Sequence, residues 1–196
     1  MQEVEPAVNP LKFCYVCKSY GSKSVFRNFD LTVEPGETVV LMGRSGCGKT
    51  TLLHLAAGLR KPDAGTITGV PERLSMVFQE DRLCEEFSPI WNIRLVADRP
   101  EEEIRSLLRE LGLAAEADSP VATLSGGMKR RVAIARAVLY DGELLLLDEA
   151  FRGLDGETLR ETVACVRLRS AGKTVLCATH NEAVAELLGG RIICLD

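Results

Sequence analysis

The sequence predicts an α/β fold in which helices flank a mostly parallel β-sheet. Three observations support this prediction: apolar runs of strand length end in polar residues, helical segments separate these runs, and a glycine-rich loop joins one run to a helix. We expect a single domain over residues 1–196, with its core at 1–79 and 140–196. A small antiparallel β layer is expected at the start of the core, and a helical subdomain is expected as an insertion at about 80–139.

The first segment contains two expected strands, Leu11 to Tyr20 and Val25 to Val33, with Gly21 between them. Two strands joined by such a short turn predict an antiparallel pair, which forms the expected β layer. The aromatic ring of Tyr20 could stack on an adenine at the strand end. An aromatic in this position more commonly packs on its neighbours.

A glycine-rich loop follows the apolar strand Thr38 to Met42 and matches the pattern G-x-x-x-x-G-K-T. Its glycines let the backbone curl with N–H groups pointing inward, Lys49 can reach terminal phosphates, and the Thr50 hydroxyl can ligate Mg²⁺. The helix expected from Lys49 to Ala57 points its positive end at the same phosphates. The pattern therefore predicts nucleoside triphosphate binding by Gly43, Arg44, Ser45, Gly46, Cys47, Gly48, Lys49, Thr50 and Thr51.

Two short strands are expected after this helix, Gly65 to Gly69 and Arg73 to Phe78, and Gln79 ends the second one. The chain then becomes helical in character. Ser88-Pro89 predicts a helix start, because a hydroxyl can cap the helix and proline is favoured at its first position. Apolar residues at helical spacing predict a second helix from Pro100 to Leu111. We assign this region to the inserted helical subdomain.

A second anion-binding pattern, Ser125-Gly126-Gly127, precedes a helix expected from Lys129 to Leu139. Free backbone N–H groups, a hydroxyl and a positive helix end together can bind a phosphate. The same residues could also serve only as a flexible helix cap. The residues alone leave both interpretations open.

Two adjacent carboxylates, Asp148 and Glu149, follow the apolar run from Glu143 to Leu147. This run is expected as a parallel strand that is covered on both faces. Its carboxyl end lies on the edge of the sheet at which α/β folds bind ligands. Charged groups at the end of a buried strand are costly unless they meet a cation or a proton-transfer task, so we expect a functional role for both.

The last quarter of the chain repeats the alternation of helix and strand. A helix is expected from about Glu157 to Arg169, a strand from Thr174 to Thr179, a helix from Asn181 to Leu188 and a final strand from Arg191 to Leu195. His180 ends a strand as Asp148 does, so it falls on the same edge of the sheet. We therefore expect a functional role for His180 as well.

Composition limits the possible partners and compartments. A net charge of −4 and a pI near 5.4 argue against a nucleic-acid partner, and no run reaches the 18 or so apolar residues of a membrane span. An acidic start without an apolar run is not a signal peptide. Seven scattered cysteines fit thiols in a reducing cytoplasm. Cys14 and Cys17 have a metal-site spacing, but residues three apart on a regular strand point to opposite faces, so we expect no metal there.

In this order along the chain, the motifs resemble the ATP-binding cassette (ABC) ATPase family. Its fold is that of P-loop NTPases, with a RecA-like, mostly parallel sheet. The resemblance covers nearly the whole chain. It rests on the glycine-rich loop, Gln79, Leu124-Ser125-Gly126-Gly127, the apolar run that ends in Asp148-Glu149, Gly153-Leu154-Asp155, and His180.

The resemblance implies that the cofactors are ATP and Mg²⁺. Tyr20 would stack on adenine, and Gly43 to Thr51 would hold the phosphates. Thr50 and Gln79 would ligate Mg²⁺ directly, with Asp148 acting on the ion mainly through water. The catalytic residues implied are Glu149 as general base, His180 as a contact to the γ-phosphate, Lys49 and Gln79.

The resemblance also implies protein partners. Ser125, Gly126 and Gly127 of one subunit would close on the ATP held by a second copy, and Asp155 would lie at the contact of this head-to-tail dimer. The dimer would drive transmembrane permease subunits on the cytoplasmic face of the cell membrane, together with a solute-binding protein. The groove for the permease would form at about Glu80 to Leu95.

Several residues indicate a branch of the family. Met128, Phe151 and the segment Glu80-Asp81-Arg82-Leu83 resemble the importers of nitrate, sulfonate and taurine. Ala150 stands where relatives usually have proline, and Arg130 where they often have glutamine.

The leading hypothesis is therefore the ATP-hydrolysing subunit of an ABC importer. An alternative is a soluble ABC ATPase that acts on nucleic acid or ribosomes, although such proteins usually carry tandem cassettes, a coiled coil or basic extensions. A P-loop kinase of small molecules would leave Ser125-Gly126-Gly127 and His180 unexplained.

Overall fold

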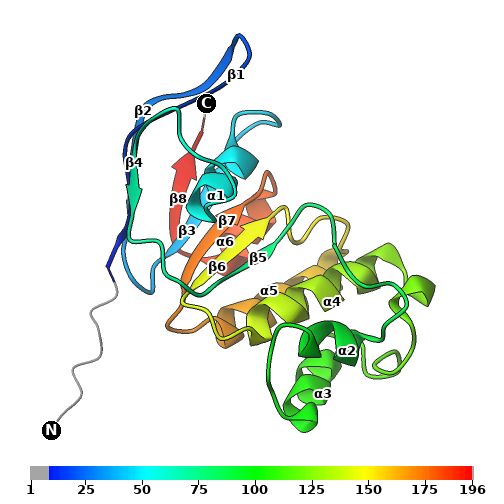
Figure 1. Ribbon diagram of the computed structural model, residues 1–196. Helices are drawn as coiled ribbons and strands as arrows, with labels where there is room; N and C mark the ends of the chain where they lie inside the picture. The colour runs from blue at the N-terminus through cyan, green and yellow to red at the C-terminus, as the bar shows by residue number, and fades with distance from the viewer. Residues whose placement is uncertain (1–8, 196) are drawn as a thin grey trace, which may run out of the picture.

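A five-stranded parallel sheet lies at the centre of the protein in the computed structural model, which describes residues 9–195 (Figure 1). Its strand order is β5-β6-β7-β3-β8, and every neighbouring pair is parallel. Helices flank the sheet, which confirms the predicted α/β class. The strands are β3 Thr38–Met42, β5 Leu74–Val77, β6 Leu144–Asp148, β7 Thr174–Ala178 and β8 Arg191–Cys194.

Side chains of the central strands alternate between two apolar cores. In β3, Val39 and Leu41 face one core, and Val40 between them faces the other. The same alternation holds in β6, where Leu144 and Leu146 face the first core. Because both faces are covered, β3 and β6 are apolar along most of their length, as expected of buried parallel strands.

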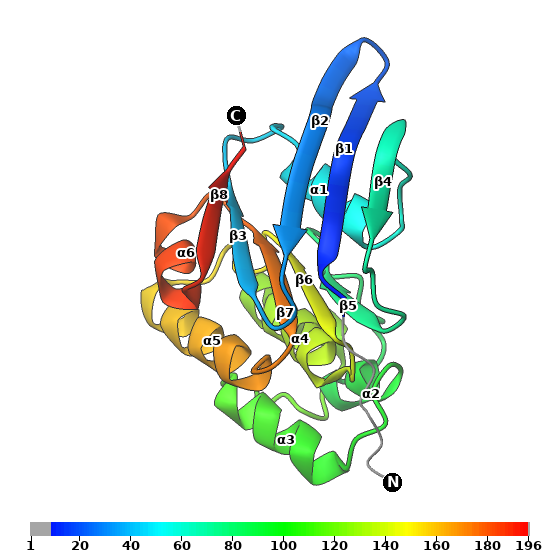
Figure 2. The same ribbon diagram turned by 90° about the vertical axis from the view of Figure 1, so that its left-hand side faces the viewer.

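A second sheet of three antiparallel strands forms the expected β layer. Its order is β2-β1-β4, with β1 at Leu11–Tyr20, β2 at Lys23–Val33 and β4 at Ala64–Thr68. The sequence predicted the first two strands as a pair, and β4 joins them from beyond the glycine-rich loop. Figure 2 shows this layer in front of α1, Lys49–Ala56, which packs between the two sheets.

A bulge in β1 overturns one assumption made from the sequence. Tyr15 has a φ of 50°, and the pairing with β2 shifts between Phe13 and Val16. As a result Phe13 and Val16, three residues apart, are both buried on the core side. Strict alternation therefore does not separate Cys14 from Cys17. The Cys17 thiol instead lies against Asn28, with Sγ 3.4 Å from both the side-chain oxygen and the backbone nitrogen.

Three helices cover the opposite face of the central sheet, α4 Gly126–Leu139, α5 Gly156–Arg169 and α6 Glu182–Leu188. Helix α4 belongs to two cores at once. Ala133 and Ala137 pack under the sheet, whereas Val132 and Ala135 pack into the helical subdomain. The helix therefore connects the core around the central sheet to the helical subdomain.

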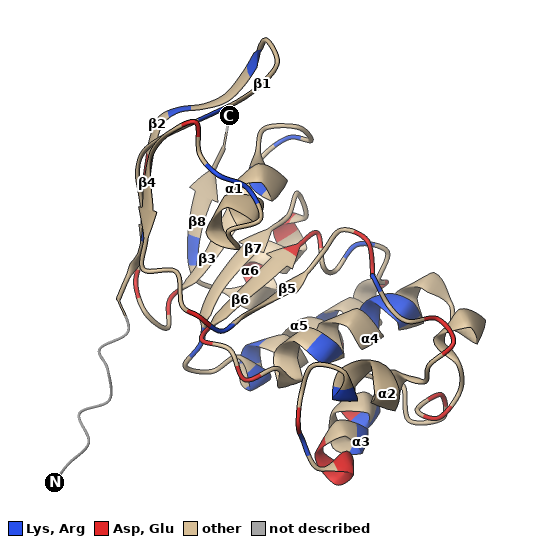
Figure 3. Cartoon of the chain, viewed as in Figure 1, with Lys and Arg blue, Asp and Glu red and all other residues tan. Residues whose placement is uncertain are grey.

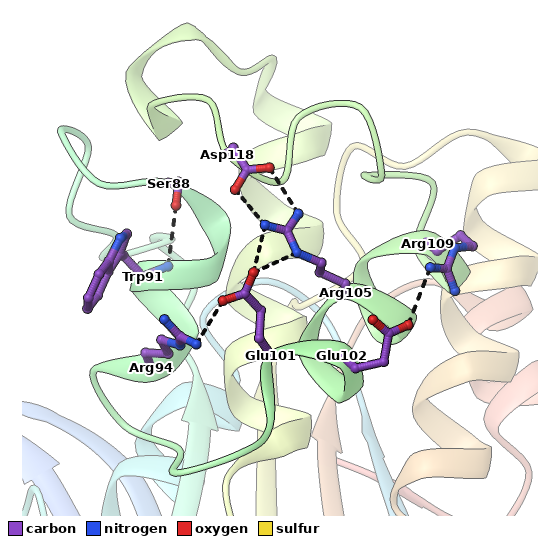
Figure 4. A network of polar contacts seen from close by, with 8 residues as sticks. All are labelled: Ser88, Trp91, Arg94, Glu101, Glu102, Arg105, Arg109 and Asp118. Atoms are coloured by element: carbon purple, nitrogen blue, oxygen red, sulfur yellow. Dashed lines mark hydrogen bonds and ion pairs between the residues drawn. The ribbon is translucent and has the colours of Figure 1, made fainter.

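The helical subdomain contains α2 Pro89–Arg94, α3 Glu101–Glu110 and a short 3₁₀ helix at Val121–Thr123. Ser88 caps α2 as predicted, accepting a hydrogen bond from the Trp91 N–H at 3.4 Å. Figure 4 shows this cap beside a network of ion pairs centred on Arg105, which bonds to both Glu101 and Asp118. Residues 80–88 and 112–120 contain no α-helix, so the subdomain is less helical than expected.

Within residues 9–195, no helix is both long and apolar enough to cross a membrane. All seven cysteines lie in this range, and none of them forms a disulfide.

An ion pair between α3 and α5 gives a testable prediction about stability. The Arg169 guanidinium bonds to both carboxylate oxygens of Glu110 and lowers the pKa of that carboxyl below its usual value near 4.5. A carboxyl whose pKa is lowered by folding stabilises the protein above its usual pKa, and this stabilisation is lost as the pH falls through the folded value. Glu110→Gln should therefore lower the melting temperature at pH 7 by about 2–4 °C, for a loss of about 1 kcal/mol.

Thermal melts of the two proteins between pH 3 and pH 8 check this expectation. The difference should be constant at neutral pH and shrink in acid. Glu102→Gln is the matched control, because Glu102 lies on the same helix, is exposed, and sits 3.9 Å from Arg109. A difference of the same size at pH 3 and pH 7 would show that the ion pair is not its source.

Candidate functional site

A cleft of about 710 Å³ opens where the carboxyl ends of the central strands meet the end of β1. Eleven of the residues that line it were predicted as site residues from the sequence. Three more were not. The lining residues are Tyr20, Lys23, Val25, Arg44, Ser45, Gly46, Gly48, Lys49, Thr50, Thr51, Gln79, Glu149, Arg152 and His180.

The glycine-rich loop turns back over the start of α1 and holds a buried lysine. Lys49 is 7% exposed, and its ammonium group donates to the Gly43 carbonyl at 2.7 Å and the Arg44 carbonyl at 3.1 Å. Gly48 has a φ of 114°, which only glycine adopts readily. The loop thus fixes a cation at the floor of the cleft, where it can bind an anion.

A hydrogen bond joins the first turn of α1 to the end of β6. The Thr50 hydroxyl donates to Asp148 Oδ1 at 3.0 Å, and Asp148 is only 1% exposed. Burial raises the pKa of this carboxyl, while the hydrogen bond from Thr50 lowers it, and burial is the stronger effect. A hydroxyl and a carboxylate held together are the oxygen donors that Mg²⁺ prefers, so the pair fits this ion.

Glu149 and His180 form a second pair at the same edge of the sheet. Glu149 has a φ of 48°, a conformation that costs a residue with a side chain about 1 kcal/mol or more, and its N–H donates to the Ala178 carbonyl at 2.9 Å. His180 Nδ1 lies 2.9 Å from Glu149 Oε1. A carboxylate can only accept, so the imidazole donates through Nδ1. This contact orients the Glu149 carboxylate at the edge of the cleft.

Sequence reasoning missed three lining residues, Lys23, Val25 and Arg152. Arg152 follows Glu149 by one tight turn, in which its N–H donates to the Glu149 carbonyl at 3.1 Å. Its place between a strand end and a helix start, on the ligand-binding edge, is the signal that could have found it. Lys23 donates to the Gly46 carbonyl at 3.1 Å, so it braces the glycine-rich loop from β2.

Two predicted residues of the glycine-rich loop, Gly43 and Cys47, do not line the cleft. The Cys47 thiol packs against the core beneath the loop. Gly43 supplies its carbonyl to Lys49. Asp148 lies below the cleft floor and reaches it through Thr50.

The structure does not bring Ser125, Gly126, Gly127 or Asp155 into this cleft. Ser125 caps α4 by accepting from the Met128 N–H at 3.3 Å, and Asp155 caps α5 by accepting from the Thr158 N–H at 3.2 Å. Gly127 lies beside the turn at Gly153 that leads to Asp155. These residues therefore form a separate group at the start of two neighbouring helices.

Comparison with known protein families gives one match over most of this site. The ABC transporter family model matches residues 26–152. An aliphatic sulfonates import ATP-binding protein, SsuB of Granulibacter bethesdensis, is 44% identical over 186 residues, which cover 92% of this chain and 77% of that protein. SsuB 1 of Paraburkholderia xenovorans is 41% identical over 189 residues, which cover 92% of this chain but only 56% of its own length.

Solved structures of similar fold include two states of one protein. The dimeric structure of MJ0796, a bacterial ABC transporter cassette, is 28% identical with a TM-score of 0.83, and the match covers 94% of each chain. A post-hydrolysis state of MJ0796 bound to ADP and Pi is 30% identical with a TM-score of 0.82, covering 95% of this chain and 94% of that one.

The close approach of β2 to the glycine-rich loop gives a prediction for two glycines. A Cβ at Gly48 would lie 2.6 Å from Val25 Cγ1 and 2.8 Å from Phe26 Cζ, whereas one at Gly46 would meet only Lys23 Nζ, at 3.6 Å. Both have a positive φ, so backbone strain is common to both. Gly48→Ala should therefore lower the free energy of unfolding by about 1–3 kcal/mol more than Gly46→Ala, as measured by urea denaturation. Equal losses would mean that β2 does not confine the loop.

Proposed function

The chain belongs to the ABC transporter family of ATPases, and we propose that it is the ATP-binding and ATP-hydrolysing subunit of an importer. One observation carries the proposal. A single cleft gathers the glycine-rich loop with Gln79, Glu149 and His180, whereas the Ser125-Gly126-Gly127 group of the same chain lies outside it. A cleft that holds the groups for phosphate binding and water activation, but lacks one anion-binding group, is half of a shared ATP site.

In this proposal the cleft binds ATP with its base near β1 and its phosphates on α1. Tyr20 is 44% exposed at the end of β1, so its ring is available to stack on adenine. The backbone N–H groups of the loop and the helix N-terminus bind the phosphates, and Lys49 adds a fixed positive charge. Arg152 adds a second cation to the lining of the cleft.

Hydrolysis requires an activated water and stabilised phosphate charge. Thr50, Gln79 and Asp148 would hold Mg²⁺, and this ion would neutralise negative charge on the phosphates. Glu149 accepts a proton from the attacking water, and His180 holds the Glu149 carboxylate in place through the 2.9 Å contact. Because the His180 contact fixes the orientation of the Glu149 carboxylate, little reorganisation of this base is needed during the reaction.

A second copy of the chain would complete the site. Ser125, Gly126 and Gly127 of that copy would close over the phosphates, and Asp155 would lie at the contact between the two chains. The dimeric MJ0796 cassette, which shares this fold over 94% of the chain, supports this arrangement. Two such sites in a head-to-tail dimer would let ATP binding pull the two copies together.

The permease would dock on the helical subdomain. Four large apolar residues are exposed around α2, which is unusual for a surface without a partner: Phe87, Trp91, Leu95 and Val96 are 45%, 56%, 54% and 44% exposed. We name these four residues the α2 apolar patch. In Figure 4 the Trp91 side chain points away from the ion-pair network. The patch follows Gln79 in the chain, so one chain segment would connect a permease bound there to the ATP site.

The proposal extends to the solute and the compartment. Names of the relatives support an aliphatic sulfonate as the class of transported solute. A solute-binding protein would deliver it to the permease. Through the permease, this chain would sit on the cytoplasmic face of the membrane.

The role of Glu149 predicts a trapped state. Glu149→Gln keeps the loop and the cation ligands, so it should bind Mg-ATP as well as the wild type does. Without the base, hydrolysis should slow by at least about a hundredfold. The variant should then accumulate as an ATP-bound dimer, measured by size-exclusion chromatography with light scattering. A monomer at high protein concentration with saturating Mg-ATP would contradict the shared site.

If the permease binds the α2 apolar patch, polar substitutions in the patch should remove permease binding. A tagged chain purified from native membranes should bring permease subunits with it. Trp91→Ser together with Leu95→Ser should abolish this co-purification and leave ATP binding within about twofold. Leu168→Ser is the matched control, because Leu168 is 72% exposed on α5, away from the patch. Recovery of ribosomal or repair proteins in place of a permease would favour a soluble ABC ATPase instead.

A further inference from the structure

Two arginines of α4 hold the chain segment that follows β5. Arg130 donates to the Phe78 carbonyl at 2.7 Å and to the Gln79 carbonyl at 2.5 Å. Arg136 donates to the carbonyls of the next residues, Arg82 at 2.8 Å and Asp81 at 3.2 Å. Figure 3 shows basic residues along α4. Four carbonyls of one five-residue segment are thus bonded to a single helix.

The contact made by Arg130 is buried and specific. The residue is 8% exposed, and two of its nitrogens each reach a separate carbonyl. Asp81 Oδ1 lies 3.1 Å from Arg130 Nη1, without hydrogen-bond geometry among the described residues, so it acts as a nearby counter-charge. A planar guanidinium presents its donors in a fixed fork and so holds the two carbonyls in a defined geometry, which the flexible ammonium group of a lysine fixes less well.

The segment itself has an unusual shape that this contact maintains. Arg82 has a φ of 47°, and its guanidinium carbon lies 3.7 Å from the centre of the Phe78 ring. Arg82 thus packs on Phe78 within the turn, and α4 binds the turn through the hydrogen bonds of Arg130 and Arg136. Gln79 lies inside this turn, and it also lines the cleft.

The same helix begins at the Ser125-Gly126-Gly127 group. Ser125 caps α4, and Arg130 lies five residues further along, about 7.5 Å along the helix axis. A helix transmits displacement along its axis as a rigid element. The helix and the Arg130 bond therefore form a continuous connection from Ser125 to the Gln79 carbonyl.

We propose that Arg130 is a positioning residue that fixes Gln79 in the cleft and ties its position to that of Ser125-Gly126-Gly127. The inference rests on the proposed function, in which Gln79 serves the ATP of its own chain and the Ser125 group serves the ATP of the partner. Arg130 thereby links the two sites of the dimer within each chain. Arg136 supports the link by holding the far side of the turn.

A double-mutant cycle tests this role, using the full chain and steady-state ATP hydrolysis with Mg²⁺ titrated at saturating ATP. Arg130→Ala, which removes every side-chain donor, should lower kcat about tenfold and raise the Mg²⁺ concentration for half-maximal rate about threefold or more. In the Gln79→Ala background the same substitution should change kcat by less than about twofold, because the residue that Arg130 positions has no side-chain amide left to misplace. Binding of ATP without Mg²⁺ should stay within about twofold.

Two further variants keep the test valid if Arg130→Ala folds poorly. Arg130→Lys keeps the charge but lacks the planar fork of donors, so it should show a smaller effect in the same direction. Arg99→Gln removes a guanidinium bond to the Leu139 carbonyl at the other end of α4, so its kcat and Mg²⁺ dependence should match the wild type. Melting temperatures of all variants separate loss of fold from loss of position.

The outcomes separate this inference from the proposed function. If Gln79→Ala lowers hydrolysis and Arg130→Ala lowers it by the same factor in both backgrounds, Arg130 has only a structural role. If Gln79→Ala leaves hydrolysis and its Mg²⁺ dependence unchanged, the role of Gln79 in the proposed function fails instead.

Discussion

The hydrogen bond from the Thr50 hydroxyl to the buried Asp148 carboxylate holds the functional region together. It joins the helix after β3 to the end of β6, two strands that are separated in the sheet by β7. Because Asp148 is buried, its negative charge needs both the Thr50 donor and a nearby cation. Lys49 and a bound Mg²⁺ would supply the positive charge. The glycine-rich loop, Glu149 and His180 then fall into one cleft because all of them follow strands of this sheet.

Much of the fold could be predicted because its physical causes are local. Apolar runs that end in Asp148 and in His180 indicate buried parallel strands, and the loop between Met42 and Lys49 carries its own chemistry in its spacing. The bulge at Tyr15 could not be predicted, because it depends on pairing with β2. Arg152 was missed for a different reason: its place between a strand end and a helix start is a usable signal, but an arginine in a turn matches none of the motifs on which the other site residues were predicted. Helix α4 was expected within the subdomain, but long-range packing places it in both cores.

In the proposed function the cleft lacks only the Ser125-Gly126-Gly127 group, which a second copy would supply. Closure of the two copies over ATP would explain how ATP binding could do mechanical work. The chain keeps its Ser125-Gly126-Gly127 group on α4, away from its own cleft, and α4 contacts the segment around Gln79. The helical subdomain also carries the α2 apolar patch. In the proposed function, closure over ATP and docking of a membrane partner would therefore involve the same part of the protein, which α4 connects to the cleft.

The most direct test of the shared site mixes two inactive chains. Lys49→Ala removes the phosphate-binding cation, and Ser125→Ala removes a group that should act only on the partner's ATP. Each variant alone should hydrolyse ATP very slowly, whereas an equal mixture should form mixed dimers with one intact site, up to about a quarter of the wild-type sites. Hydrolysis by the mixture that does not exceed that of the separate variants would contradict a site built from two copies.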